Sequence, residues 1–274
     1  MTSVSHSPRT YLFVPGDRPE RFQKALASGA DAVVLDLEDA VLGEAKDDAR
    51  EAIGRFISSA TPEMQTRLVV RINDEASLWF AADLQMLRDR HADCVMLPKA
   101  ERIATIARVR AICPTINVIA LIETAIGVLR AEAIAAAPGV QRLVFGTIDF
   151  ALDLGLSGDP VGFDYAASRL ALASRAAGLP APVAGVTPEI ADEAPLLADL
   201  QRARAHGFSA KLCIHPKQIA PIHRAMQPTA DELTWARKVI AAAESAPGAL
   251  QVDGRMVDKP VLQRAHALLA KQRP

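Results

Sequence analysis

The sequence of 274 residues has little of what nucleic-acid-binding and membrane proteins need. Its 31 basic and 32 acidic side chains nearly cancel, and neither sign forms a long run. A nucleic acid or an anionic membrane surface requires a basic stripe, so we expect neither as a partner. Aromatic residues make up only 4% of the chain, too few for a platform on which bases stack. The charge balance still allows an anionic small molecule, because a few local cations can hold one.

Cysteine is also scarce, and its spacing excludes a cysteine-based metal site. Cys94, Cys113 and Cys213 form no C-x-x-C pair and lie in apolar surroundings, so we interpret them as buried thiols. Residues 1–10 lack the apolar segment of a secretory signal, and we expect a short frayed leader there. No apolar run approaches the roughly 20 residues of a transmembrane helix. We therefore expect a soluble, cytoplasmic protein.

What the sequence has instead is a regular alternation of apolar runs and amphipathic stretches. The runs are rich in Val, Ile and Leu and apolar on both faces, as in the covered strands of a parallel sheet. They span residues 11–15, 32–37, 68–72, 94–98, 118–122, 143–145, 183–186 and 211–215. Helical spacing occurs between them, for example at 44–57, 78–90 and 189–205, the last with an expected N-cap at Thr187 before Pro188. Eight alternations predict an α/β protein of the (β/α)₈ TIM-barrel class. A doubly wound open sheet is the alternative, because periodicity does not show closure.

The chain is expected to contain a barrel and an appendage. No linker or composition break divides residues 10–226, so we assign them to one TIM-barrel catalytic domain. Residues 227–274 are more than a barrel needs for closure, and they contain a helical pattern at 231–244, a turn with Gly and Asp, and a last helix. We predict a C-terminal helical extension. Such an appendage commonly packs against a symmetry mate, which makes it a candidate for exchange between subunits.

Two carboxylates end neighbouring apolar runs. In a TIM barrel the catalytic residues lie on the loops after the strands, so Glu123 and Asp149, after the fifth and sixth runs, would converge on one rim. Hard oxygen ligands without a nearby His or Cys favour Mg²⁺, with Mn²⁺ as a substitute. The alternative is an ion pair of a carboxylate with Lys99 or Arg71.

Two groups of cations are candidates for binding an anionic substrate. Arg71 ends the third run, and its planar fork suits a bidentate contact with a substrate carboxylate, although an ion pair with Glu38 is equally compatible with the pattern. Arg18, Arg21 and Lys24 flank a turn that opens a helix. They suit a phosphate or, alternatively, form a solvated charged face.

Seven ordered motifs make the sequence resemble the citrate lyase beta-subunit-like CoA-ester lyases of the HpcH/HpaI aldolase superfamily. In chain order they are YLFVPGDRPERFQKA, VVLDLEDAV, VVRIN, VMLPKAE, IALIETAIGV, LVFGTIDFALDLGL and AKLCIHPKQI. The resemblance extends over residues 10–269, essentially the whole chain. The set is specific because all seven motifs occur in order, whereas any one alone is weak.

The resemblance implies roles for the residues at the predicted rim. It implies a TIM barrel in which Glu123 and Asp149 hold magnesium. Arg71 would bind the carboxylate of the keto-acid half of the substrate, and the backbone around Ile148 and Asp149 would meet the same group. Glu38 would hold metal-bound waters or Arg71.

The resemblance also implies two contributions from outside that rim. The N-terminal turn would contact the phosphates of coenzyme A through Arg18 and Lys24. An aspartate near the C-terminus, lent by a neighbouring subunit, would act as the acid or base, and the matching stretch GRMVDKP places it at Asp258. The alternative for Asp258 is a surface residue that caps the final helix. The tail departs in length and composition from the longer malyl-CoA lyases, so the substrate stays open.

The function implied is that of a Mg²⁺-dependent carbon–carbon lyase of the oxo-acid-lyase type. It would cleave a citramalyl-CoA, malyl-CoA or citryl-CoA type of thioester into a keto acid and an acyl-CoA by a retro-Claisen reaction, within a homo-oligomer (a trimer or hexamer). One alternative is the beta subunit of a citrate lyase complex, which acts on an acyl-carrier-protein thioester with partner subunits. Another is a non-catalytic barrel, against which the intact metal pair, Arg71 and Asp258 speak. A lysine-imine aldolase is a further competitor, because Lys99 and Lys211 lie on predicted strands.

Overall fold

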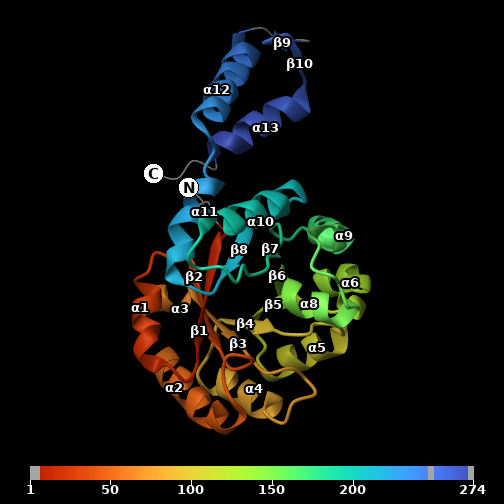
Figure 1. Cartoon of the computed structure of the whole chain (residues 1–274). Helices are drawn as coiled ribbons and strands as arrows, with labels where there is room; N and C mark the ends of the chain where they lie inside the picture. Colours follow the sequence, from red (N-terminus) through yellow and green to blue (C-terminus); the bar gives the residue numbers. More distant parts are fainter. Residues whose placement is uncertain (1–6, 246–249, 271–274) are drawn as a thin grey trace. The chain divides into compact units, whose positions relative to one another are not determined.

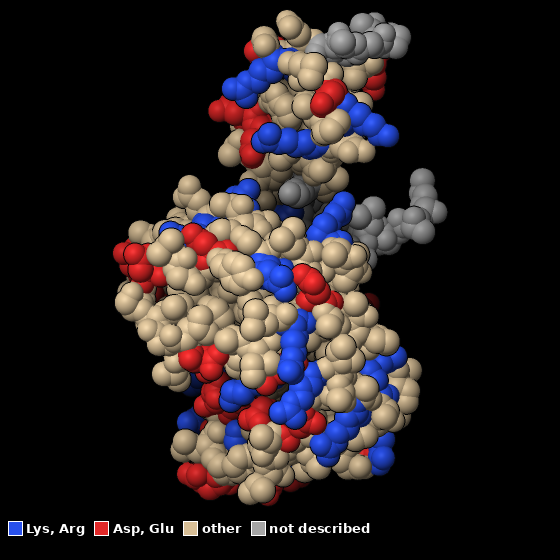
Figure 2. Space-filling model, turned by 90° about the vertical axis from the view of Figure 1, so that its right-hand side faces the viewer, with Lys and Arg blue, Asp and Glu red and all other residues tan. Residues whose placement is uncertain are grey.

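The chain folds into two compact units, Met1–Ile222 and His223–Pro274. The computed structural model describes residues 7–245 and 250–270, so most of the expected leader lies outside the described residues. Within these ranges, no helix is both long and apolar enough to cross a membrane. Acidic and basic side chains are interspersed on the face shown in Figure 2.

Eight parallel strands close into a barrel in the first unit (Figure 1). Their order around the barrel follows the chain, and β8 pairs with β1. This closure confirms the TIM-barrel prediction and rules out the open sheet. The strands are β1 (Thr10–Pro15), β2 (Ala32–Asp36), β3 (Leu68–Arg71), β4 (Cys94–Leu97), β5 (Asn117–Ile122), β6 (Val140–Phe145), β7 (Val183–Ala184) and β8 (Ala210–Cys213).

Helices follow the strands and surround the barrel (Figure 1). They are α1 (Phe22–Leu26), α2 (Lys46–Ser59), α3 (Pro62–Gln65), α4 (Phe80–Asp89), α5 (Ile103–Ile112), α6 (Ala125–Leu129), α7 (Ala131–Ala135), α8 (Thr147–Leu154), α9 (Asp164–Ala176), α10 (Glu193–Ala205) and α11 (Ile219–Met226). Single 3₁₀ turns stand at Pro19–Arg21, Gly43–Ala45, Pro160–Phe163 and Pro216–Gln218. Because every βα loop lies at the carboxyl ends of the strands, this end of the barrel gathers the polar strand-end residues.

The barrel interior is filled by side chains from all eight strands. The set comprises Tyr11, Ala32, Val34, Val69, Met96, Ile119, Leu121, Val144, Val183, Ala210 and Leu212. The barrel is therefore a packed core and not a pore, as in other folds of this type. The three cysteines are free; Cys113 and Cys213 are buried as expected, and Cys94 is partly buried.

One predicted helix start is wrong. Helix α10 begins at Glu193, where Asp192 accepts a hydrogen bond from the N–H of Ala194 at 2.9 Å. The hydroxyl of Thr187 instead donates to Asp199 at 2.6 Å, a contact from the β7 loop to the middle of the helix. Asp192 is a stronger N-cap candidate because its carboxylate accepts from the free N–H groups of the first turn.

The second unit contains two helices and a small hairpin. Helix α12 (Ala230–Ser245) packs on α13 (Lys259–Ala270) around a core of Ala236, Val239, Val257 and Ala265. Between them, β9 (Leu250–Val252) and β10 (Arg255–Val257) pair antiparallel where the sequence suggested only a turn. The dipeptide Asp253-Gly254 has positive φ at both residues (49° and 76°), the requirement of a tight type I′ hairpin.

Candidate active site

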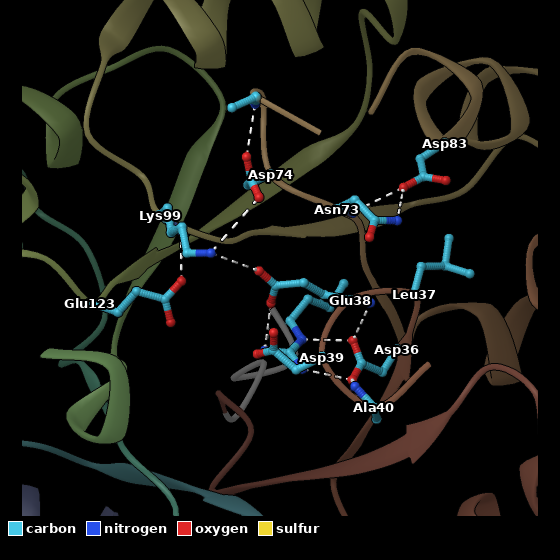
Figure 3. A network of polar contacts seen from close by, with 12 residues as sticks. Asp36, Leu37, Glu38, Asp39, Ala40, Asn73, Asp74, Asp83, Lys99 and Glu123 are labelled. Atoms are coloured by element: carbon cyan, nitrogen blue, oxygen red, sulfur yellow. Dashed lines mark hydrogen bonds and ion pairs between the residues drawn. The ribbon is translucent and has the colours of Figure 1, made fainter. Parts of the chain in front are cut away.

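The polar residues predicted for the rim follow the carboxyl ends of their strands. Arg71 is the last residue of β3, Glu38 follows β2, Lys99 follows β4, Glu123 follows β5, and Asp149 lies in the first turn of α8 after β6. Figure 3 shows the side chains of Glu38, Lys99 and Glu123 directed toward one another. The structure thus brings together residues up to about 110 positions apart in the chain.

Arg71 is held by three carboxylates. Its Nε and Nη2 donate to the two oxygens of Asp36 at 2.7 and 2.6 Å. Its Nη1 lies 2.8 Å from Glu38 Oε2 and 3.3 Å from Asp39 Oδ2. The ring of Phe13 lies 4.8 Å from the guanidinium carbon, and Arg71 is only 8% exposed. The alternative pair with Glu38 thus exists, and the bidentate edge of the fork is occupied by Asp36.

Asp36 is the site residue that sequence reasoning missed. It ends β2 and stands beside Arg71 of β3 in the parallel register. Besides Arg71, it accepts the N–H of Glu38 at 2.9 Å and that of Ala40 at 3.3 Å. The available signal was an aspartate that closes a fully apolar strand, because a buried carboxylate requires a cation. The strand register that selects Arg71 is not visible in one sequence.

Glu123 is a buried carboxylate with little compensating charge. It is 2% exposed, and its Oε1 accepts the N–H of Lys99 at 2.7 Å. Lys99 has a φ of 45°, a strained conformation that aims this N–H at the carboxylate. A Cβ at Gly146 would lie 2.6 Å from Glu123 Oε2, so only glycine fits there. Burial raises the pKa of Glu123 to about 7; the charge of Asp149 adds to this rise, and the Lys99 N–H opposes it.

Glu38 joins the two sides of the rim. Its Oε1 lies 3.8 Å from Lys99 Nζ, while its Oε2 contacts Arg71. Burial raises the pKa of Glu38 to about 8; the charge of Arg71 opposes this rise, and the carboxylates of Asp39, Glu123 and Asp36 add to it. A single guanidinium does not neutralise so many carboxylates.

Neither candidate lysine has the surroundings of an imine-forming residue at this rim. Lys99 Nζ also lies 3.8 Å from Asp74 Oδ2. Burial lowers the pKa of Lys99, but Glu38 and Asp74 outweigh it and raise the pKa overall. Lys211 is flanked by Ala210 and Leu212, which face the barrel interior, so its side chain points outward and donates to Gly185 O at 2.8 Å. Burial lowers the pKa of Lys211, as an imine-forming amine requires, but its side chain points away from the rim, so a lysine imine would not form beside the carboxylate cluster.

Glu123 and Asp149 fit a magnesium ion. The two residues follow adjacent strands, β5 and β6. Glu123 is buried and poorly neutralised, and the half-buried Asp149 is close enough to raise the pKa of Glu123. In residues 7–245 and 250–270, no group of three or more His, Cys, Asp or Glu side chains could hold a metal ion. Magnesium needs only one or two protein carboxylates, since waters and substrate oxygens supply its other ligands.

The other predicted residues are more exposed. Arg18 and Lys24 are exposed, and Arg18 Nε lies 3.9 Å from Asp17 Oδ1. Ile148 is 55% exposed and lines a cavity of about 450 Å³ between α8, α9 and α10, outside the barrel. Asp258, in the second unit, is exposed and accepts the N–H of Val261 at 3.1 Å, which makes it the N-cap of α13.

A closed (β/α)₈ barrel with a buried arginine–carboxylate cluster beside two metal-suited carboxylates belongs to the class of barrel lyases and aldolases. The chain belongs to the HpcH/HpaI aldolase/citrate lyase family, whose model matches residues 9–216. A second model, a carbon–carbon bond lyase of the TIM-barrel fold, matches residues 172–273. The family resemblance seen in the motifs is thereby confirmed, and the chain is a member of a carbon–carbon lyase family.

Individual relatives are similar to this chain over nearly its whole length. A citrate lyase subunit beta-like protein of Mycobacterium tuberculosis is 41% identical over 95% of this chain and 94% of its own. A (3S)-malyl-CoA thioesterase of Cereibacter sphaeroides is 34% identical over 99% and 96%. The crystal structure of protein CitE from M. tuberculosis in complex with magnesium, acetoacetate and coenzyme A superposes with a TM-score of 0.86, at 39% identity over 96% of this chain and 97% of that one.

Proposed function

We propose that this protein is a Mg²⁺-dependent lyase that cleaves the CoA thioester of a small hydroxy acid into a keto acid and an acyl-CoA. The observation that carries the proposal is the pairing of Glu123 and Asp149 beside the Arg71 cluster on one rim. The similarity to a structure described with magnesium, acetoacetate and coenzyme A supports both the metal and the substrate class.

Each side chain at the rim has a chemical task in this reaction. Bound at Glu123 and Asp149, magnesium supplies Lewis-acid stabilisation of negative charge on substrate oxygens. Arg71 Nη1 binds the carboxylate of the acid half, while Asp36 fixes the plane of the guanidinium. The backbone at Ile148 and Asp149 meets the same carboxylate. The hydroxyl on C3 gives its proton to a base and becomes the keto oxygen as the bond between C2 and C3 breaks. The electron pair of that bond goes to C2, the carbon next to the thioester, and C2 takes a proton, so the net reaction moves one proton from the hydroxyl to C2.

We assign that proton to Asp258 of a neighbouring subunit in a homo-oligomer. Asp258 belongs to an appendage beyond the barrel, and its carboxylate is exposed. Asp258→Asn is a sharp test because Asn caps a helix as well as Asp does. We expect the variant to keep its stability and its coenzyme A affinity and to lose most turnover. Mixed subunits of Asp258→Asn and Glu123→Gln should regain activity; no recovery after verified subunit exchange would contradict a shared site.

Substrate identity is tested by turnover of purified protein on a panel of thioesters. Citramalyl-CoA, malyl-CoA and citryl-CoA should be assayed with Mg²⁺, with Mn²⁺ and after EDTA treatment, with keto acid and free thiol followed separately. Keto acid without free thiol identifies a lyase, whereas free thiol identifies a thioesterase, as the name of the Cereibacter relative suggests for that protein. Metal-independent turnover would contradict the proposal.

The alternative function is that of a citrate lyase beta subunit acting on an acyl-carrier-protein thioester. The name of the Mycobacterium relative favours it. Turnover of citryl-acyl carrier protein but not citryl-CoA, with partner subunits co-purifying, would select this alternative. A cytoplasmic location suits either function, since the three cysteines are free.

A further inference from the structure

A buried lysine lies directly behind the carboxylate cluster and belongs to none of the roles above. Lys46, the first residue of α2, is 6% exposed. Its Nζ donates to Leu37 O at 2.7 Å, to Glu38 O at 2.8 Å and to Asn73 Oδ1 at 2.7 Å. The ring of Trp79 lies 5.2 Å from the same ammonium. All three N–H groups of the ammonium thus have acceptors.

The position of Lys46 is unfavourable for the helix that it begins. A cation in the first turn of α2, directly after the 3₁₀ turn Gly43–Ala45, opposes the helix dipole. The neighbouring Asp47 and Asp48 follow the usual preference for acidic residues in the first turn. A residue that breaks the local rule, and is buried where it does so, is expected to serve the site.

The contacts of Lys46 continue into a second helix. Asn73 donates through Nδ2 to Asp83 Oδ2 at 2.7 Å, and its backbone N–H donates to the same oxygen at 2.9 Å. Asp83 of α4 is fully buried and also accepts from Arg50 of α2 at 2.7 Å. Figure 3 shows Asn73 and Asp83 beside Leu37, on the far side of Glu38 from Lys99. The loop after β2 is therefore fastened to α2 and α4.

We propose that Lys46 is a positioning residue of the active site, which fixes Glu38 against Arg71 by binding the carbonyl oxygens of Leu37 and Glu38. Without this ammonium, the carbonyl of Leu37 loses its side-chain donor and that of Glu38 keeps only the N–H of Val41 at 3.0 Å, so the loop that carries Glu38 is free to shift. The catalytic consequence rests on the proposed function, whereas the structural consequence does not.

Two measurements on Lys46→Met test the proposal, with Arg55→Met as the matched control. Arg55 lies on the same helix, in an ion pair with Glu51 in which both side chains are 63% exposed. We expect hydrogen exchange of the 37–41 amides to become about tenfold faster or more in Lys46→Met, while the rest of the barrel stays within about twofold. We expect kcat to fall roughly 10- to 100-fold, with KM for the thioester within about threefold. Arg55→Met should change neither.

Three results would overturn the proposal: unchanged exchange at 37–41, equal acceleration throughout the barrel, or a kcat within twofold of wild type despite local acceleration. If Lys46→Met does not fold, Asn73→Ala removes one of the three acceptors and should give a smaller change of the same pattern; no change at 37–41 would then count against the proposal. Wild-type protein inactive on every thioester would refute the proposed function and the catalytic half of this inference. The exchange result alone would then decide whether Lys46 fixes the loop.

Discussion

The two sides of the barrel rim differ in the groups that surround their buried carboxylates. After β2 and β3, carboxylates surround a guanidinium, and Lys46 and Asn73 hold the loop from behind. After β5 and β6, Glu123 accepts one backbone N–H from Lys99 and has Asp149 as its acidic neighbour. On the first side the carboxylates contact a cation of the protein directly, although the pKa of Glu38 stays raised to about 8. On the second side the close neighbours of Glu123 are a backbone N–H and a second carboxylate, so a divalent cation would neutralise it.

This difference assigns separate tasks to the two sides. A cluster completed by its own ion pairs is rigid before substrate arrives and can orient it. Two carboxylates without a nearby cation lower the stability of the metal-free protein, and a cation that binds them raises it. Substitutions on the first side should therefore lower stability as well as turnover, whereas those on the second should lower turnover and the metal response without a loss of stability.

The largest effect is expected on the β2–β3 side. Arg71→Met leaves Asp36 and Glu38 buried without their cation, so the free energy of unfolding should fall by about 3–5 kcal/mol. The loss should be the same with and without Mg²⁺ in denaturant unfolding. Arg55→Met, which breaks the exposed pair with Glu51, should cost less than about 1 kcal/mol. An equal loss of unfolding free energy in Arg71→Met and Arg55→Met would show that the Arg71 cluster contributes no more than an exposed ion pair.

Glu123→Gln should give the opposite pattern. Glutamine keeps an acceptor for the Lys99 N–H and removes a poorly compensated charge, so metal-free protein at pH 8 should be as stable as wild type or more stable. Turnover should fall by about 100- to 1,000-fold, and Mg²⁺ should no longer raise the melting temperature. Glu132→Gln, at a carboxylate that is 64% exposed beside Arg169, is the matched control. A destabilisation as large as that of Arg71→Met would show that Glu123 belongs to a structural ion pair.

The pH dependence of stability should report the raised pKa of one buried carboxyl on each side. Glu123 and Glu38 have pKa values raised from 4.5 to about 7 and about 8 in the folded protein. The folded state thus keeps protons that the unfolded state has released. The resulting stability is fully present below pH 4.5 and is lost as pH rises through 7 and 8. For Glu123 it amounts to about 3 kcal/mol at most.

The measurement is the melting temperature between pH 5 and 9 in EDTA, for wild type and Glu123→Gln. The difference between the two curves should grow in favour of the variant as pH rises. Saturating Mg²⁺ should reduce that difference, because the metal requires the ionised carboxylate. A difference that is flat, or that grows toward low pH, would contradict a raised Glu123 pKa.

The smallest effect is expected away from both sides, at the exposed cations of the N-terminal turn. Replacing Arg18 and Lys24 together by Ala should weaken coenzyme A binding about tenfold, because exposed contacts contribute up to about 1 kcal/mol each. Keto-acid binding and stability should not change. Calorimetry that shows equal loss for both ligands would mean that these residues do not select the phosphates.

Much of the first unit could be predicted from the sequence. Strands apolar on both faces and polar residues at their ends are local signals, and they identified the barrel and placed Arg71, Glu38, Glu123 and Asp149 at one rim. Contacts that depend on register or burial could not be found this way. The clearest example is Asp36, whose pairing with Arg71 needs the alignment of β2 with β3.

Other misses had a signal that was present but weak. Lys46 stands at the start of an amphipathic helix, where a charged side chain is ordinarily solvated, so only its burial reveals it. The β9–β10 hairpin was signalled by Asp253-Gly254, but strands of three residues are too short for an alternating pattern. The start of α10 was misplaced because two capping residues, Thr187 and Asp192, compete in the sequence.

Anomalous diffraction from crystals soaked in Mn²⁺ would show whether the β5–β6 side holds the metal. We expect one strong peak on the rim, bonded to one oxygen each of Glu123 and Asp149 at about 2.2 Å. The peak should be absent from Glu123→Gln crystals and retained in Arg71→Lys crystals. A peak held by Asp36, Glu38 or Asp39 instead, or no peak at saturating Mn²⁺, would contradict the account.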